Sequence, residues 1–358
     1  MSHPFADGYR QARQWFRAAA TAAGADLSSV RNDVAQGPEG EDLVTDVAWL
    51  GPRSASRVLV AVSGTHGIEG YCGSACQIDL LRAGPALAPD TAVLLVHALN
   101  PYGFAYQRRV DENNVDLNRN FVDHAKPPVN RDYPALHPLL VPADWTGPAR
   151  AAADGALMAV VRDRGERYVQ AVVTAGQWTH ADGLFYGGAE PAWSRRVLTD
   201  LVRVHLRGRR RIGYVDLHTG LGPRAAGEPI FRGGRDDGAY ARARRWYGPE
   251  LSRSEDGTSS STEISGNTAG LVADTLTGAE ELTAITLEFG TLTGLAVLNA
   301  LRADNWLSRQ SSPPDDLRAA IKKEIRAAFH PPDEDWRTAV TARAKVVFAQ
   351  AMAGLTEH

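Results

Sequence analysis

Residues 57–69, which read RVLVAVSGTHGIE, decide the fold that this sequence adopts. Five of the six residues after Arg57 are Val, Leu or Ala, and such a run is typical of a strand buried on both faces of a sheet. Small residues end the run, and His66 and Glu69 follow three positions apart. One turn of chain can bring their imidazole nitrogen and carboxylate oxygen onto one metal ion.

Further segments repeat this pattern of an apolar run that ends in polar residues. We predict strands at 91–98 (TAVLLVHA), 212–220 (IGYVDLHTG) and 284–290 (AITLEFG). Loops at the carboxyl ends of neighbouring strands in an open α/β sheet meet in one crevice. His218 ends its strand as His66 follows its own, and Glu288 lies near the end of the last strand.

His218 changes the meaning of the first two polar residues. A lone histidine after a strand is more often a hydrogen-bonded structural residue. His66, Glu69 and His218 together form a set of two histidines and one carboxylate, which is how catalytic zinc sites leave a fourth position for water. Glu288 is costly to bury without a partner. A metal ion lowers the pKa of water, so we predict one zinc ion per chain and Glu288 as the carboxylate that takes the proton and passes it to a leaving amine.

The loop at 100–121, NPYGFAYQRRVDENNVDLNRNF, holds three arginines, Arg108, Arg109 and Arg119. A charged loop of this kind is ordinarily solvated. This one follows a predicted buried strand, so its arginines should face His66. The planar guanidinium fork binds carboxylates through paired hydrogen bonds, which predicts a substrate with a free carboxylate.

Composition narrows the class of protein. The chain has 358 residues, 44% hydrophobic and 23% charged, with a net charge of −3, so we expect a globular protein with a large core and no nucleic-acid partner. The basic run 207–211 is expected at a solvated helix end. Cys72 and Cys76 lie four apart on a predicted helix, which favours a reducing compartment. Without an apolar signal core or a bilayer-length run, the sequence predicts a cytoplasmic protein that does not bind membranes.

The remaining segments give coarser expectations. Residues 123–145, rich in Pro and His, are expected to form a long ordered loop, and the aromatic and glycine-rich residues 176–188 suit a pocket wall. Residues 41–50 are expected to form a strand near a sheet edge. Apolar periodicity predicts helices at 7–23, 71–82, 149–167, 192–206, 315–329 and 335–355.

Four motifs occur in the order found in the zinc carboxypeptidase (M14-like) metallopeptidases: HGIE at 66–69, NVDLNRNF at 114–121, VDLHTG at 215–220 and LEFGT at 287–291. The sequence as a whole most resembles the DUF2817 branch of these proteins, and the resemblance covers roughly residues 8–310. It implies one α/β domain over 1–358, a mixed central sheet of about eight strands covered by helices on both faces. Helices at about 313–355 would close its C-terminal end.

The resemblance also assigns roles. It implies the zinc ligands and the general base named above, with Asn118 and Arg119 holding the substrate's terminal carboxylate. Arg109 would polarise the scissile carbonyl and stabilise the oxyanion, and Asp116 would orient the first zinc histidine. Arg108 is adjacent to Arg109 and is an alternative for its role.

Some expectations stay open at this point. The peptidases of this family use a loop tyrosine, for which Tyr240 and Tyr247 qualify by position only. The expected function is zinc-dependent hydrolysis of an amide bond next to a free carboxylate. The aspartoacylase and succinylglutamate desuccinylase relatives share these motifs and cleave N-acyl amino acids, so a deacylase is the alternative. A catalytically silent metal-binding or ligand-binding protein is the third reading, and the oligomeric state is open.

Overall fold

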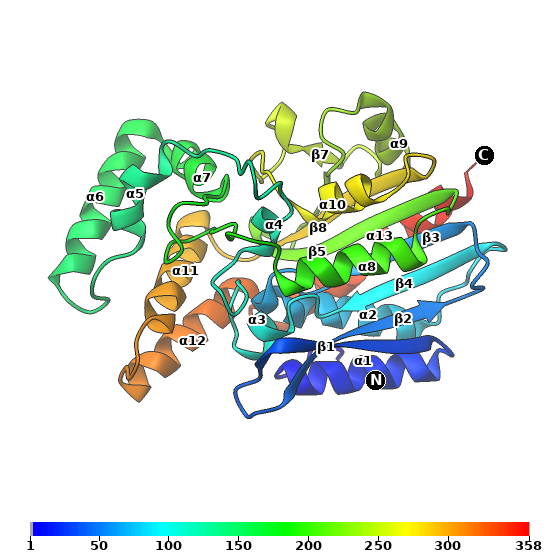
Figure 1. The fold of residues 1–358 in the computed structure, drawn as a ribbon, viewed down its shortest axis with the longest axis horizontal. Helices are drawn as coiled ribbons and strands as arrows, with labels where there is room; N and C mark the ends of the chain where they lie inside the picture. Colours follow the sequence, from blue (N-terminus) through cyan, green and yellow to red (C-terminus); the bar gives the residue numbers. More distant parts are fainter. Residues whose placement is uncertain (1–2, 358) are drawn as a thin grey trace.

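A mixed sheet forms the centre of the protein, whose computed structural model describes residues 3–357 (Figure 1). Its eight strands lie in the order β1-β2-β4-β3-β5-β8-β6-β7. The strands are β1 (Asp26–Gln36), β2 (Asp42–Leu50), β3 (Arg57–Val62), β4 (Thr91–His97), β5 (Arg211–Arg224), β6 (Gly227–Phe231), β7 (Ser252–Arg253) and β8 (Glu281–Gly290). The expected mixed sheet is confirmed.

The four central strands run parallel, because β3 pairs in parallel with both β4 and β5, and β5 pairs in parallel with β8. The outer pairs β1–β2, β2–β4 and β6–β8 are antiparallel. Parallel neighbours end at the same edge of a sheet. His66 after β3 is therefore brought close to His218 and Glu288. These two residues lie within β5 and β8, and β5 continues to Arg224, beyond the predicted end of that strand.

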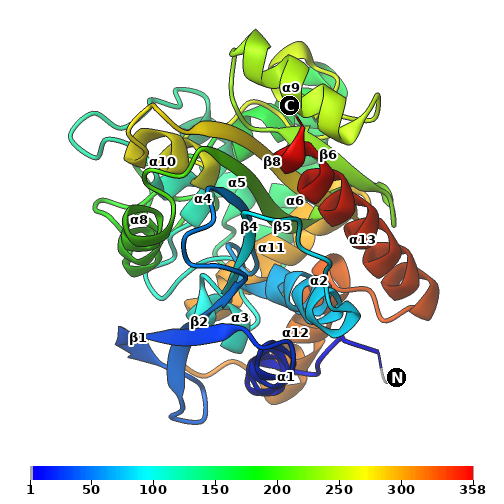
Figure 2. The ribbon, with the colours of Figure 1, turned by 90° about the vertical axis from the view of Figure 1, so that its right-hand side faces the viewer.

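Helices cover both faces of the sheet. Figure 2 shows α1, α2 and α13 on one side of the strands and α8 and α10 on the other. The helices are α1 (Tyr9–Ala22), α2 (Gly70–Ala83), α3 (Pro101–Ala105), α4 (Leu117–Asn120), α5 (Tyr133–Leu140), α6 (Pro148–Arg164), α7 (Glu166–Thr174), α8 (Trp193–His205), α9 (Asp237–Tyr247), α10 (Thr268–Thr275), α11 (Gly294–Ser308), α12 (Asp315–Phe329) and α13 (Glu334–Thr356), with short 3-10 helices η1 (Gly67–Glu69) and η2 (Ser254–Asp256).

Strand β3 shows how the two cores form. Leu59 and Ala61 belong to the core cluster beneath α2 and α13, whereas Val58, Val60 and Val62 belong to the cluster beneath α8. Alternate side chains of a strand point to opposite faces, and all five are at most 1% exposed. The prediction of a strand buried on both faces is confirmed, and it fixes the point at which the chain leaves the sheet before His66.

A group of helices, α5, α6, α7, α11 and α12, lies to one side of the sheet, on the left of Figure 1. Residues 123–145 were expected to form a loop, and this is wrong in part because they contain α5. Pro134 stands in the first turn of α5, where a missing N–H costs nothing, and Pro138 lies inside the helix. The sequence also gave no prediction for β1.

The predicted helix at 71–82 is α2, and its two cysteines, Cys72 and Cys76, are buried free thiols. Within residues 3–357, no helix has both the length and the apolar composition required to cross a bilayer.

Candidate active site

The turn after β3 places His66 and Glu69 by docking onto the loop that follows β4. Gly67 N donates to Arg109 O at 3.1 Å, and Ile68 N donates to Arg108 O at 2.8 Å. A Cβ on Gly67 would lie 2.0 Å from the carbonyl carbon of Gly103, closer than any side chain allows. Glycine at this position therefore lets η1 pack against α3 and hold the two polar side chains at the end of β3.

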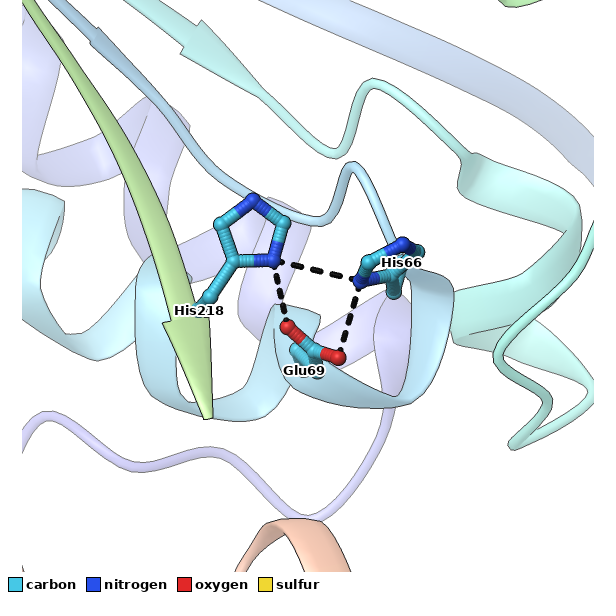
Figure 3. A group of neighbouring side chains, drawn as sticks. All are labelled: His66, Glu69 and His218. Carbon is cyan, nitrogen blue, oxygen red and sulfur yellow. Dashed lines mark hydrogen bonds and ion pairs between the residues drawn. The ribbon is translucent and has the colours of Figure 1, made fainter. Parts of the chain in front are cut away.

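Glu69 stands between the two histidines (Figure 3). Its Oε1 lies 2.9 Å from His66 Nδ1 and its Oε2 lies 2.7 Å from His218 Nδ1. The two Nδ1 atoms are 3.2 Å apart, and the three side chains are buried. The structure thus brings together the three residues that the sequence predicted as a set, although 149 positions separate Glu69 from His218.

This cluster fits a metal ion. Each of the three residues offers one ligand atom, and these atoms all lie within 4.8 Å of one another. Ligand atoms about 2.0–2.1 Å from a tetrahedral zinc ion lie roughly 3.3 Å apart, close to the 3.2 Å between the two Nδ1 atoms. Two imidazoles and one carboxylate are also the donor types that suit zinc. His66, Glu69 and His218 are therefore the residues that would hold the metal.

Each histidine is oriented through its other nitrogen by an aspartate. Asp116 Oδ1 lies 3.0 Å from His66 Nε2, and Asp216 Oδ2 lies 2.8 Å from His218 Nε2. Such contacts fix the tautomer and the ring orientation of metal-binding histidines. Asp116 agrees with the expectation from the family resemblance. Asp216 had no predicted role, although it stands two residues before His218 and hence on the same face of β5.

Hydroxyl groups hold Asp216 in turn. Thr65 Oγ1 donates to Asp216 Oδ1 at 2.8 Å, and Thr268 Oγ1 donates to Oδ2 at 2.7 Å. Burial alone lowers the pKa of His218, but Asp216 and Glu69 together raise it to about 10. The same histidine and His66 hold the pKa of Glu69 well below its usual range against the opposing effect of burial. The surroundings of the cluster thus favour a positive charge.

Arg109 is the arginine of the loop that reaches the cluster. Its Nη1 donates to Glu69 Oε1 at 3.1 Å and its Nε donates to Asp116 Oδ2 at 2.9 Å. Arg108 instead pairs with Asp304, with 3.0 Å between Nε and Oδ2. The geometry therefore distinguishes the two adjacent arginines: of Arg108 and Arg109, only Arg109 lines the cavity at the cluster.

Glu288 faces the same cavity from β8, where it stands level with His218 on β5. Its Oε1 accepts a hydrogen bond from Leu221 N at 3.0 Å, and no other hydrogen bond to this carboxylate is found within residues 3–357. Burial and the nearby charge of Glu69 raise the pKa of Glu288 to about 7. A carboxylate with a pKa near the working pH can both accept and return a proton.

Asn118 and Arg119 also line the cavity, but protein groups occupy part of their hydrogen-bonding capacity. Arg119 Nε donates to Thr174 O at 2.8 Å and Nη1 donates to Asn118 O at 2.8 Å. Asn118 Nδ2 lies 3.3 Å from His218 Nε2. A guanidinium carries five N–H donors, so Arg119 retains donors for a ligand.

The cavity has a volume of about 70 Å³, and its lining includes the three predicted metal ligands, Glu288, Arg109, Asn118 and Arg119, but not Arg108. Neither Tyr240 nor Tyr247 lines it, and no other tyrosine of the described residues does so. Phe185 lines it from segment 176–188, as expected for a pocket wall, with Arg109 Cζ 4.9 Å from its ring centre. Arg232, which follows β6, lines it too. No motif in the sequence points to Arg232.

A second, larger cavity of about 290 Å³ adjoins the first and shares Phe185 and Leu221 with it. Apolar side chains of α7 and α11 form much of its wall, among them Val169, Val173 and Val297. A polar chamber at the cluster thus opens beside an apolar one.

Comparison with known families places the chain. The family described as "Protein of unknown function (DUF2817)" matches residues 5–343. No curated protein matches the chain.

The chain also matches solved structures over most of its length. Carboxypeptidase A from Helicoverpa armigera is 14% identical, with a TM-score of 0.50, over 99% of this chain and 75% of that one. A putative succinylglutamate desuccinylase/aspartoacylase from Shewanella frigidimarina is 19% identical (TM-score 0.38; 74% and 64% covered), and murein-tripeptide amidase MpaA from Escherichia coli O157 is 17% identical (TM-score 0.35; 86% and 94% covered). The first comparison identifies the carboxypeptidase fold.

Proposed function

The chain belongs to the DUF2817 family, and from this premise we propose that it is a zinc-dependent hydrolase that cleaves an amide bond next to a free carboxylate. One observation carries the proposal: the His66, Glu69 and His218 cluster shares a small cavity with Glu288 and Arg109. A metal site alone would serve a binding protein. A metal site that faces a carboxylate with a raised pKa and a cation is suited to hydrolysis.

Each residue has a task in this reaction. A bound zinc ion supplies Lewis acidity towards the carbonyl and lowers the pKa of water. Glu288 accepts the proton that water loses as its oxygen attacks the amide carbon, and it returns the proton to the nitrogen when the C–N bond breaks. Arg109 donates hydrogen bonds to the oxygen on which negative charge develops, while Asp116 keeps its guanidinium in place.

Recognition of the free carboxylate falls to Asn118 and Arg119. Arg119 is 3% exposed, so a charge-assisted hydrogen bond to it forms away from water and gains strength. Phe185 lies under the guanidinium, with Arg119 Cζ 5.5 Å from its ring centre, and it limits where the carboxylate can approach. In this proposal the cleavable amide lies between Arg119 and Glu288.

A second function, deacylation of N-acyl amino acids, is favoured by the adjoining apolar cavity. An acyl group needs an apolar wall and no peptide-like hydrogen bonds, which is what Val169, Val173 and Val297 offer. A peptide would place its preceding residue in the same space. Both reactions use the same residues at the cluster and differ in the group that enters the larger cavity.

The test combines a substrate panel with one substitution. Purified protein is assayed with dipeptides and N-acyl amino acids, each as the free acid and as the amide, before and after chelation and after zinc is restored. Glu288→Gln keeps the shape of the side chain but cannot carry a proton, so we expect kcat to fall roughly 10²–10⁴-fold with zinc content unchanged.

Glu228→Gln is the matched control. Glu228 pairs with Glu288 across β6 and β8 but accepts hydrogen bonds from Ser252 and Ser260 outside the cavity. This variant should keep its activity. Hydrolysis that survives chelation, or zinc that is lost together with activity in Glu288→Gln, would contradict the proposed role of Glu288 or of the metal.

A further inference from the structure

Three arginines line the cavity at the cluster, and they differ in how their charge is balanced. Arg109 pairs with Glu69 and Asp116. Arg119 lies 4.0 Å from Asp116 Oδ1. Within residues 3–357, Arg232 forms no ion pair with any carboxylate, and Glu288, the carboxylate with the largest effect on its charge, acts from a longer distance.

Only neutral groups contact the Arg232 guanidinium. Its Nε donates to Thr286 Oγ1 at 3.0 Å. The two terminal nitrogens have longer contacts of 3.4 Å, from Nη1 to Ser254 Oγ and from Nη2 to Ser261 Oγ. A cation removed from water costs free energy unless an anion or strong hydrogen bonds compensate. The end of the guanidinium fork is therefore held weakly. Because Arg232 lines the cavity, a ligand with a stronger acceptor can bind to it there.

Strand pairing sets the position of Arg232 in the cavity. Arg232 N donates to Ala284 O at 3.0 Å, which fixes the residue beside β8. Its partner Thr286 stands two residues before Glu288 and on the same face of the strand, about 7 Å away along it. Burial and the nearby charge of Arg109 lower the pKa of Arg119, and the charge of Arg232 lowers it to a smaller extent. A ligand held by Arg119 and cleaved beside Glu288 would thus extend towards Arg232.

We propose that Arg232 binds a second carboxylate, carried by the side chain of the amino acid whose free carboxylate Arg119 holds. The inference rests on the proposed hydrolase function and narrows its substrates to amides of acidic amino acids, of the aspartate and glutamate type. Arg119 and Arg232 line the same small cavity, so two cations are available for the two carboxylates of such a molecule.

The size and charge of the cavity support this class over others. Its volume is about 70 Å³, and one water molecule needs roughly 10–15 Å³, so a compact side chain fits and a large aromatic one does not. An apolar side chain would leave the partly buried Arg232 guanidinium without a directly paired anion. A basic one would face a like charge.

The experiment compares substrates that differ by one carboxylate. L-Ala-L-Glu and L-Ala-L-Gln have nearly the same shape, as do N-acetyl-L-glutamate and N-acetyl-L-glutamine. The wild-type protein should cleave the glutamate member of the reactive pair with a kcat/KM at least about tenfold higher, because only that member satisfies Arg232. Arg232→Met should remove this preference by lowering kcat/KM for the glutamate substrate alone.

Two further variants guard against a loss of folding. Arg232→Lys keeps the charge but not the fork, and it should retain part of the preference. Arg235→Met is the matched control, since Arg235 lies three residues further along the chain on the surface and pairs with Glu263. It should cleave both substrates as the wild type does.

A binding measurement separates this inference from the proposed function. Calorimetry with free L-glutamate and L-glutamine needs no turnover. If glutamate binds more tightly than glutamine, if this difference depends on Arg232, and if the protein cleaves none of the substrates, the proposed hydrolase function is refuted. The proposed role of Arg232 in carboxylate binding is then supported. Cleavage without preference in the wild type would overturn the role of Arg232 and leave the hydrolase intact. Equal losses on both substrates in Arg232→Met would overturn it as well.

Discussion

His97 and His218 occupy similar places in the sheet and have opposite electrostatic surroundings. Strands β4 and β5 flank β3, and both histidines lie within two residues of the level of Val62 in β3. Both are buried, at 0% and 3% exposure. Burial and position therefore do not decide which histidine can bind a metal.

Their neighbours account for the difference. His97 stacks on Phe16 with 4.3 Å between ring centres, lies 2.9 Å from Ser74 Oγ through Nε2, and has no partner at Nδ1. Burial lowers the pKa of His97 to about 4. The contacts of His218 with Glu69 and Asp216 raise its pKa to about 10. Carboxylates on both sides of an imidazole thus distinguish a candidate ligand from a histidine of the core.

Removing one carboxylate should weaken the contrast most. Asp216→Asn keeps the shape next to His218 but not the charge, so we expect zinc affinity to fall roughly 10–100-fold, measured by competition with a chelator of known affinity. Asp46→Asn is the control, because Asp46 pairs with Arg13 away from the cluster. Equal zinc affinity in the wild type and in Asp216→Asn would mean that the His218 contact is only structural.

Protonation of His97 should have a smaller effect, which appears in the pH dependence of the free energy of unfolding. Its folded pKa lies below the usual 6.5, so its contribution is present above that pH and is lost as pH falls towards about 4. Asp46 raises and Arg13 lowers this pKa to smaller extents than burial does. As the pH falls, we expect the free energy of unfolding of the metal-free wild type to decrease faster than that of the metal-free His97→Gln variant. The difference between the two slopes should be at most about 1.4 kcal/mol per pH unit.

Denaturant titrations at several pH values between 7 and 4 measure this difference, because groups common to both proteins cancel. If the difference in free energy of unfolding between the two proteins stays constant with pH, His97 is not held neutral in the folded state. The electrostatic contrast between His97 and His218 would then be wrong for His97.

The sequence predicted those parts of the fold that local periodicity encodes. Buried strands such as β3 are continuous apolar runs, and the motif around His66 follows directly. Strand β1 was missed because most of its residues are exposed or only partly buried, so its text, DLSSVRNDVAQ, lacks a clear apolar alternation. Helix α5 was missed because two prolines lie within it, and proline ordinarily argues against a helix.

The residues of the site likewise fall into those that a local sequence pattern predicts and those that it does not. His66, Glu69, His218 and Glu288 each stand at or near the end of an apolar strand, so their position carries a signal. Asp216 lies inside such a strand and had no predicted role, although its spacing from His218 was informative. Arg232 meets Thr286 only through the pairing of β6 with β8, a contact between distant segments that no local pattern contains.

The metal content of two variants tests the central claim most directly. Protein purified without added metal is analysed for zinc as the wild type, as His218→Ala and as His97→Ala, each checked for folding by circular dichroism. We predict about one zinc ion per chain in the wild type and in His97→Ala, and far less in His218→Ala, because a catalytic zinc site with three protein ligands loses one of them. Full zinc occupancy in folded His218→Ala would contradict the assignment of the site.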